Sequence, residues 1–202
     1  MRYAEITRSL MGVACLIAPL LNVVTTLLYL LDNRPLEAVI GLWTMTLYIA
    51  AYLGIAHTIG QSRPVYGAVV ASLAILHAVG ISAYQTRAVG QMLVIDGTFE
   101  RQEQVWDLIS LMPVGAAYMV LGLLGPILPI VSAVGLMRTG VVPLWSAAAL
   151  AVAGVVFFLA QVLNLAYSVT YPLYALLFVA GFVPVGLHLM RVGERARQPA
   201  ST

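Results

Sequence analysis

Six long apolar stretches, separated by short clusters of proline, arginine and turn-forming residues, constrain this chain more than any other feature. A helix needs about 20 residues to cross the hydrocarbon core of a bilayer, because it rises about 1.5 Å per residue. The stretches cover residues 9–31, 36–60, 64–85, 108–137, 143–165 and 168–190. The sequence therefore predicts a single all-α domain over residues 1–202, a polytopic transmembrane bundle of six helices.

The composition excludes a water-soluble fold. Charged residues make up only 9% of the chain and hydrophobic residues 61%, whereas about a quarter of the residues in a soluble domain are charged. A net charge of +2 gives no support to nucleic-acid binding. The single cysteine, Cys15, excludes an intramolecular disulfide and a cysteine-based metal cage.

Arginine is unevenly distributed between the two sides of the predicted bundle. With six crossings, both termini lie on one side, together with most of the arginines. Cytoplasmic loops concentrate positive charge, so we expect both termini in the cytoplasm and the chain in the inner (plasma) membrane. The terminal side holds Arg2, Arg8, Arg63, Arg138, Arg191, Arg195 and Arg197, and the outer side holds Arg34, Arg87 and Arg101.

Residues 86–107 form the only sizeable predicted segment outside the membrane, and we expect an external helical hairpin there. A lid over an outward-facing pocket is the alternative interpretation. The fourth span is irregular, because Gly122, Gly125, Pro126 and Pro129 fall in one stretch that is longer than a perpendicular crossing requires. We expect a kink or break between Gly122 and Pro129.

Polar side chains at membrane depth are the candidate binding residues, because each one is costly in hydrocarbon and needs a partner. Counting 1.5 Å per residue places a group of them in the outer half of the bundle. The predicted substrate-binding residues are Asn22, Trp43, Tyr48, His77, Gln161 and Asn164.

Each candidate also has a structural interpretation. Asn22, Gln161 and Asn164 are typical of hydrogen bonds that join membrane helices. Trp43, Tyr171 and Tyr174 are typical of the aromatic belt at the membrane–water interface, and we favour the belt for these three.

His77 is the most deeply placed titratable group, and a pocket or proton role is as well supported as a hydrogen-bonded core histidine. An imidazole exposed to lipid would leave its ring nitrogens unsatisfied, so we expect His77 to face the interior, within contact reach of side chains from the first or fifth span. Asn22 and Gln161 are the expected contacts.

The sequence identifies no cofactor. His57 and His188 lie near the inner ends of two spans, as axial haem or metal ligands do, but no close His or Cys pair and no intramembrane carboxylate completes such a site. Haem or metal is therefore not expected. Catalytic signatures such as GxSxG, HExxH and the P-loop are also missing, so an enzyme is the less favoured class.

Two segments carry a resemblance to known proteins. The stretch LMRTGVVPLWSAAALAVAGVV from Leu136 to Val156 and the tail GLHLMRVGERARQP resemble small six-span bacterial membrane proteins of unknown function. The architecture is also similar to the substrate-binding subunits of vitamin importers, whose first helix packs small residues spaced by four against a partner. Ala14 and Ala18 match that spacing, which suits packing inside the bundle or between protomers.

We expect an inner-membrane protein that binds a small hydrophobic or amphipathic molecule in an outward-facing intramembrane pocket. Transport of that molecule through the pocket is the extension of this hypothesis. An intramembrane enzyme that acts on a lipid or isoprenoid, with His77 as acid or base, is one alternative. A non-catalytic assembly partner of a larger membrane complex is the other. The expected partners are the lipid bilayer, the ligand, and a second copy of the chain or a membrane subunit.

Overall fold

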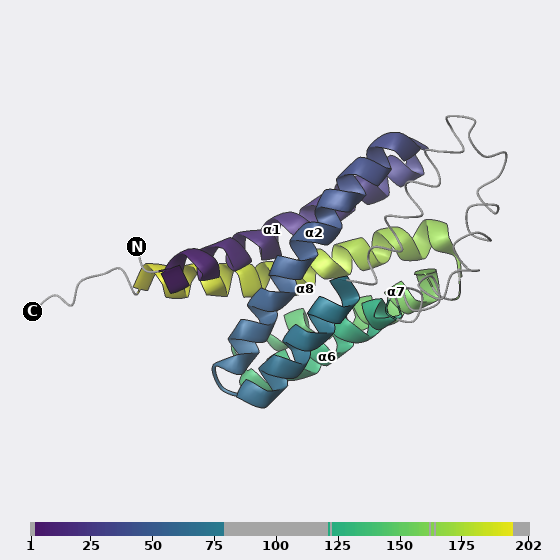
Figure 1. The fold of residues 1–202 in the computed structure, drawn as a ribbon. Coiled ribbons are helices and arrows are strands. Elements are labelled where there is room, and N and C mark those ends of the chain that lie inside the picture. The colour runs from purple at the N-terminus through teal and green to yellow at the C-terminus, as the bar shows by residue number, and fades with distance from the viewer. Residues whose placement is uncertain (1–2, 79–120, 122, 162, 164, 196–202) are drawn as a thin grey trace, which may run out of the picture.

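The structure, a computed structural model, describes residues 3–78, 121, 123–161, 163 and 165–195. Within these residues every regular element is a helix, as expected. The helices are α1 (Tyr3–Leu30), α2 (Arg34–Gly60), the helix Pro64–Ala78, α6 (Leu124–Thr139), α7 (Leu144–Gln161) and α8 (Tyr167–Arg195), drawn in Figure 1.

Three of these helices are long and apolar enough to cross a membrane, judged by length and composition. The helices Pro64–Ala78, Leu124–Thr139 and Leu144–Ala160 are apolar but shorter over the described residues. The three long ones are Tyr3–Leu30, Pro35–Gly60 and Ser168–Arg191.

α1 has the reverse of the pattern seen in a soluble helix. Its large apolar side chains point outward and are between 39% and 63% exposed at positions such as Leu10, Leu20 and Val24. Its buried face consists of small and polar residues: Gly12, Ala14, Cys15, Ala18, Pro19, Asn22, Thr25 and Thr26. Lipid removes the cost of an apolar exterior, and small residues let helices approach closely, so this arrangement is typical of a membrane helix.

The reversals between helices follow the turn signals of the sequence. The side chain of Asn33 accepts a hydrogen bond from the Leu36 amide at 3.4 Å and caps α2, whose first turn contains Pro35. Gly140 ends α6 with a φ of 64°, a conformation that glycine adopts without strain. The residues at each turn are therefore sufficient to explain where α2 begins and where α6 ends.

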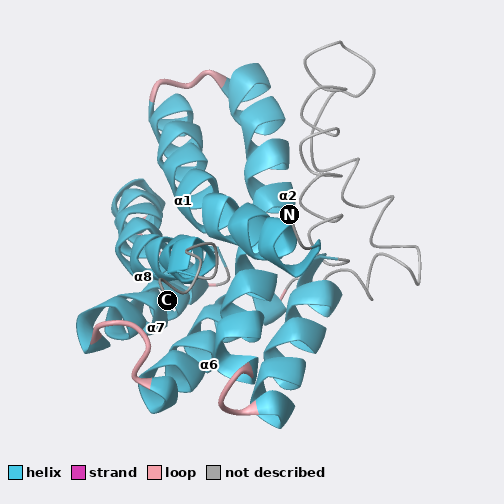
Figure 2. Cartoon of the chain, turned by 90° about the vertical axis from the view of Figure 1, so that its left-hand side faces the viewer, coloured by secondary structure: helices cyan, strands magenta, loops and turns pink. Residues whose placement is uncertain are grey.

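The helices form a ring when viewed down the bundle (Figure 2). α1 packs against α2 and α8, and α7 packs against α8 and α6. The helix Pro64–Ala78 joins α2 to α6, because Gly67 lies against Gly60 and the Tyr66 hydroxyl donates to the Val131 carbonyl at 2.8 Å. Each helix therefore has a neighbour on both sides.

Figure 1 shows the beginning of α1 and the end of α8 at the same end of the bundle. The reversals at 61–63 and 140–143 also lie toward that end, and the reversal at 31–33 lies at the opposite one. The reversals that follow α2 and α6 thus lie toward the ends of α1 and α8, with Arg63 in the first of them and Arg138 in the last turn of α6.

The fourth predicted span is described only in its second half. α6 begins at Leu124, inside the interval where a kink or break is expected, and it continues through Pro129 to Thr139. Because Pro129 has no amide hydrogen, the Gly125 carbonyl receives no helical hydrogen bond from it. Residues 108–120 and 122, and the predicted external hairpin at 86–107, lie outside the described residues.

Candidate functional site

The interior of the bundle contains two neighbouring buried polar side chains, Asn22 and Tyr48, that form no well-aligned hydrogen bond. Asn22 of α1 is 1% exposed and Tyr48 of α2 is 4% exposed. The Asn22 amide lies within interaction range of the Tyr48 hydroxyl. Neither the Asn22 Nδ2 nor the Tyr48 hydroxyl has a hydrogen-bond partner. We call this pair the polar centre.

The neighbouring hydroxyl groups on α1 do not supply the polar centre. Thr25 donates to the Leu21 carbonyl at 2.9 Å, and Thr26 donates to the Asn22 carbonyl at 2.8 Å. The Thr25 hydroxyl also lies 3.4 Å from that of Thr44 on α2. Because these threonine hydroxyls donate to backbone carbonyls of their own helix, their protons are not available to Asn22 or Tyr48.

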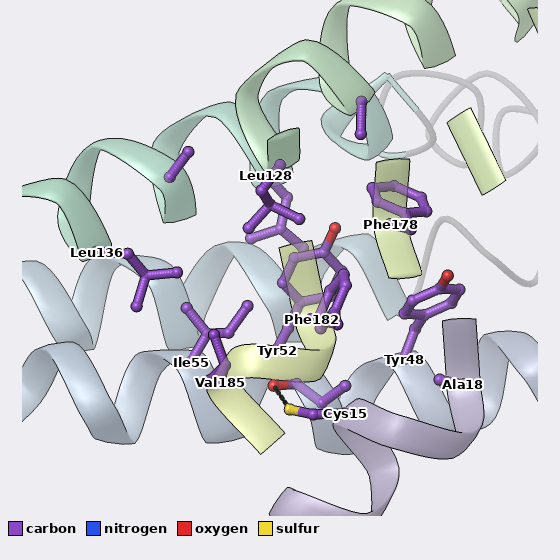
Figure 3. Close-up of a cluster of buried hydrophobic side chains, with 14 of the residues drawn as sticks. Cys15, Ala18, Tyr48, Tyr52, Ile55, Leu128, Leu136, Phe178, Phe182 and Val185 are labelled. Carbon is purple, nitrogen blue, oxygen red and sulfur yellow. Dashed lines mark hydrogen bonds between the residues drawn. The ribbon is translucent and has the colours of Figure 1, made fainter. Parts of the chain in front are cut away.

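Aromatic rings surround Tyr48. Its ring centroid lies 5.4 Å from that of Phe178 and 5.3 Å from that of Phe182, both on α8, and Figure 3 shows these side chains converging from the two helices. Tyr52, one turn along α2, adds an edge contact of 5.0 Å with Phe182. The polar centre is therefore enclosed by flat apolar surfaces at ordinary aromatic separations.

The aromatic wall continues along α8, where the prediction for Tyr171 and Tyr174 is wrong. Both are buried, at 1% and 2% exposure, and are not part of an interface belt. Tyr171 packs edge-on against Tyr29, and Tyr174 against Phe157 and Phe178. The positions 171, 174, 178 and 182 repeat at three or four residues, which is one face of a helix. That spacing is the sequence signal that would have identified this row.

His77 lies against α6 rather than beside Asn22. Its Cε1 is 3.1 Å from the place where a Cβ on Gly125 would lie, and Phe157 occupies the other side of the same space. The ring lies beside the Leu121 backbone, and its Nδ1 is buried without a hydrogen-bond partner.

Of the remaining predicted residues, only Trp43 has a side chain that the structure describes. Trp43 is 63% exposed, so it lies on the outside of the bundle. The side chain of Gln161 and all of Asn164 lie outside the described residues. The expected contact of His77 with Gln161 stays a prediction.

Small residues of the first and fifth spans are used inside the bundle. Ala14, Ala18 and Ala147 are at most 2% exposed, and Gly154 is buried against Ile130 and the Pro126 carbonyl of α6. For Ala14 and Ala18, packing within the chain is the one of the two expected roles that is observed. Ala14 and Ala18 are consequently not available as a surface for a partner subunit.

Among the described residues, no group of three His, Cys, Asp or Glu side chains converges as a metal site would require. His57 lies 3.3 Å from Gln61, measured between the two Nε2 atoms, at the end of α2. The polar centre is thus a neutral site that offers a donor from Asn22 and a hydroxyl from Tyr48.

Comparison of the chain with protein-family models, with curated proteins and with solved structures found no match.

Proposed function

We propose that the chain is a six-span inner-membrane protein, with both termini in the cytoplasm, that binds a small molecule at the polar centre and transports it. Three helices apolar enough to span a bilayer support the membrane assignment. The arginine-bearing reversals at Arg63 and Arg138 lie toward the end of the bundle that holds the chain ends, which supports the orientation.

The observation that carries the binding proposal is the pair of unpartnered groups on Asn22 and Tyr48. A buried polar group without a hydrogen bond costs about 1–3 kcal/mol, and the two lie together on different helices. A guest whose oxygen lies beside both groups would satisfy both at once. Unsatisfied buried groups in folded proteins are commonly the sites of water or ligands.

The chemistry of the polar centre indicates the class of ligand. Asn22 Nδ2 is a donor, and the Tyr48 hydroxyl is both donor and acceptor. Neither group is charged, and the adjoining Phe178 and Phe182 rings are apolar. A neutral amphipathic molecule with a carbonyl or hydroxyl oxygen and a flat or apolar body matches these features.

The test is a thermal-shift screen of the detergent-purified protein against neutral amphipathic compounds, with Asn22→Leu and Tyr48→Phe as variants. We expect ligands that stabilise the native protein to lose at least tenfold in affinity in each variant, because each removes one hydrogen bond to the guest. Tyr66→Phe is the matched control, because it removes a partly buried hydroxyl that donates to the Val131 carbonyl elsewhere in the bundle.

Two results would overturn the binding proposal. The first is a screen in which no compound stabilises the protein, with no small molecule released on denaturation. The second is a ligand whose affinity is the same in Asn22→Leu, Tyr48→Phe and Tyr66→Phe. Either would mean that Asn22 and Tyr48 are buried without binding a ligand.

The orientation has its own test. A single cysteine placed at Ser201 in a Cys15→Ala background is expected to react with an impermeant maleimide only after the cells are opened. Labelling of Ser201→Cys in intact cells would contradict cytoplasmic termini.

A second candidate function is an intramembrane enzyme, and the unpaired Nδ1 of His77 favours it. A neutral imidazole is able to take a proton from a lipid or isoprenoid substrate through its unprotonated ring nitrogen. Product formation from a lipid extract by purified protein, lost in His77→Gln, would support this function. Absence of any product with the wild-type protein would exclude it in favour of binding.

A further inference from the structure

A groove lies between α1, α2 and the helix Pro64–Ala78, apart from the polar centre. Its volume is about 460 Å³, and it is open along one side. Small-molecule sites in proteins span roughly 300–1,000 Å³, so the groove is large enough for a ligand. Its walls include Met11, Leu53, Ala56, Ala68 and Ala71, and its polar lining is His57 and Gln61.

Small residues keep this space open. Gly60 and Gly67 line the groove where α2 and the next helix meet, and a Cβ on Gly67 would lie 2.6 Å from the Gly60 Cα. The two helix ends therefore touch through backbone atoms, and the floor beside them carries only short side chains. The resulting wall is apolar over most of its length and suits a hydrocarbon chain.

Two arginines, Arg8 and Arg63, lie beside residues that line the groove. Arg8 of α1 lies one turn before Met11, and its guanidinium is within electrostatic range of the His57 ring. The Arg8 Nε is buried and has no hydrogen-bond partner. Arg63, exposed in the adjoining reversal, adds a second positive charge next to Pro64. Glu5 is the nearest acid along α1, and it has its own interaction within the structure.

The helix dipoles do not determine the sign of the electrostatic potential beside these two arginines. The negative end of α2 and the positive end of the helix Pro64–Ala78 meet at the reversal 61–63 and offset each other. Arg8 and Arg63 therefore set the local charge. A buried guanidinium nitrogen without a partner requires an acceptor, and phosphate oxygens match arginine donors well.

We propose that this groove binds a phosphate-bearing lipid, with an acyl chain along Leu53, Ala68 and Ala71 and the phosphate at Arg8, His57 and Gln61. Basic pockets between membrane helices on the arginine-rich side hold anionic headgroups in this way. The apolar lining distinguishes a lipid from free phosphate, because an inorganic anion gains nothing from the alanine and leucine walls.

The experiment measures the melting temperature of the detergent-purified chain with three probes. These are dioleoyl phosphatidylglycerol, dioleoylglycerol, which has the same chains without the phosphate, and glycerol phosphate, which has the phosphate without the chains. We expect phosphatidylglycerol to raise the melting temperature and the other two to give less than half of that shift.

Two variants locate the site. Arg8→Gln removes the charge, and Ala68→Phe fills the apolar part of the groove while Arg8 stays in place. Each is expected to lose more than half of the phosphatidylglycerol shift. Arg138→Gln is the matched control, because it removes one arginine at a different reversal, and it is expected to keep the full shift. Ala68 is exposed, so Ala68→Leu provides a milder replacement if Ala68→Phe does not fold.

Three results would overturn the proposal. Equal shifts from phosphatidylglycerol and dioleoylglycerol would show that phosphate is not recognised. An equal shift from glycerol phosphate would indicate a site for free phosphate rather than for lipid. A loss in Arg138→Gln as large as that in Arg8→Gln would indicate a general effect of charge. Because the polar centre is not altered, these outcomes are independent of the proposed function.

Discussion

Gly12 of α1 and Gly186 of α8 lie against each other, each in the space that the other's side chain would need. A Cβ on Gly186 would lie 2.8 Å from the Gly12 carbonyl oxygen, and a Cβ on Gly12 would lie 3.1 Å from the Gly186 carbonyl oxygen. The obstacles are backbone atoms, which a side-chain rotation cannot move. This contact sets how closely the first and last described helices approach, and hence the position of the α8 aromatic row beside α1 and α2.

Gly186→Ala is expected to destabilise the protein by about 1–3 kcal/mol, the usual cost of forcing extra volume into a packed interface. Gly41→Ala is the control, because its Cβ would meet only the Thr25 methyl carbon at an ordinary 3.6 Å. Alanine also favours helix over glycine, so Gly41→Ala should be neutral or stabilising. Chemical denaturation of both variants checks the difference, and equal stabilities would contradict the close contact.

Two buried serines predict opposite effects of the same substitution. Ser146 of α7 donates to the Gly181 carbonyl of α8 at 3.0 Å, whereas Ser132 Oγ of α6 has no partner. Hydrogen bonds between membrane helices contribute about 0.6 kcal/mol on average and about 1.7 at most. Ser146→Ala should therefore lower the free energy of unfolding by that amount. Ser132→Ala should leave it unchanged or raise it, and a loss in Ser132→Ala equal to that in Ser146→Ala would contradict the assignment.

The sequence predicts the turns of this fold well where the turn chemistry is local. Pro35, Pro64 and Gly140 act through their own backbone restrictions, and the observed reversals lie beside each of them. The reversal between α7 and α8 has no such signal. It places Ala166 at a φ of 43°, a conformation that alanine seldom adopts. Hydrogen bonds from the amides of Val169 and Thr170 to the Ala166 carbonyl accompany this turn.

The candidate site was predicted only in part. The depth of a residue in the membrane can be counted along a helix, but the direction in which its side chain points cannot. Counting residues placed Asn22 and Tyr48 at similar depth, and the two side chains are neighbours. The same counting placed His77 beside Asn22, yet His77 lies on Gly125. The position of His77 depends on Gly125, whose missing side chain leaves room for the imidazole. Such tertiary space has no signature in the His77 sequence neighbourhood.

Gly140 tests backbone conformation separately from packing. Its φ is 64°, and nothing lies within 4 Å of the Cβ position, so a side chain there meets only backbone strain. Gly140→Ala is expected to cost about 1–2 kcal/mol, the penalty of a left-handed residue. Gly140→Asn should recover part of this, because asparagine tolerates the conformation. Thermal unfolding of the two variants measures which is the more stable. Equal stabilities of Gly140→Ala and Gly140→Asn would contradict a purely conformational cost.

Cys15 reports on the opening of the α1 interface. Its thiol is fully buried and donates to the Ala51 carbonyl at 3.4 Å, as the dashed line in Figure 3 shows. A maleimide should therefore react only when α1 separates from α2 and α8, so the labelling rate follows the population of that open state.

The Cys15 Cβ lies 3.0 Å from the Cβ position of Gly186, and Gly186→Ala should loosen the same interface. A loss of about 1–3 kcal/mol corresponds to about a 5- to 150-fold rise in the open population. We expect the labelling rate of Gly186→Ala to rise by that factor, and that of Gly140→Ala, at a distant turn, to rise less. Rapid labelling of the native protein would contradict the burial of Cys15.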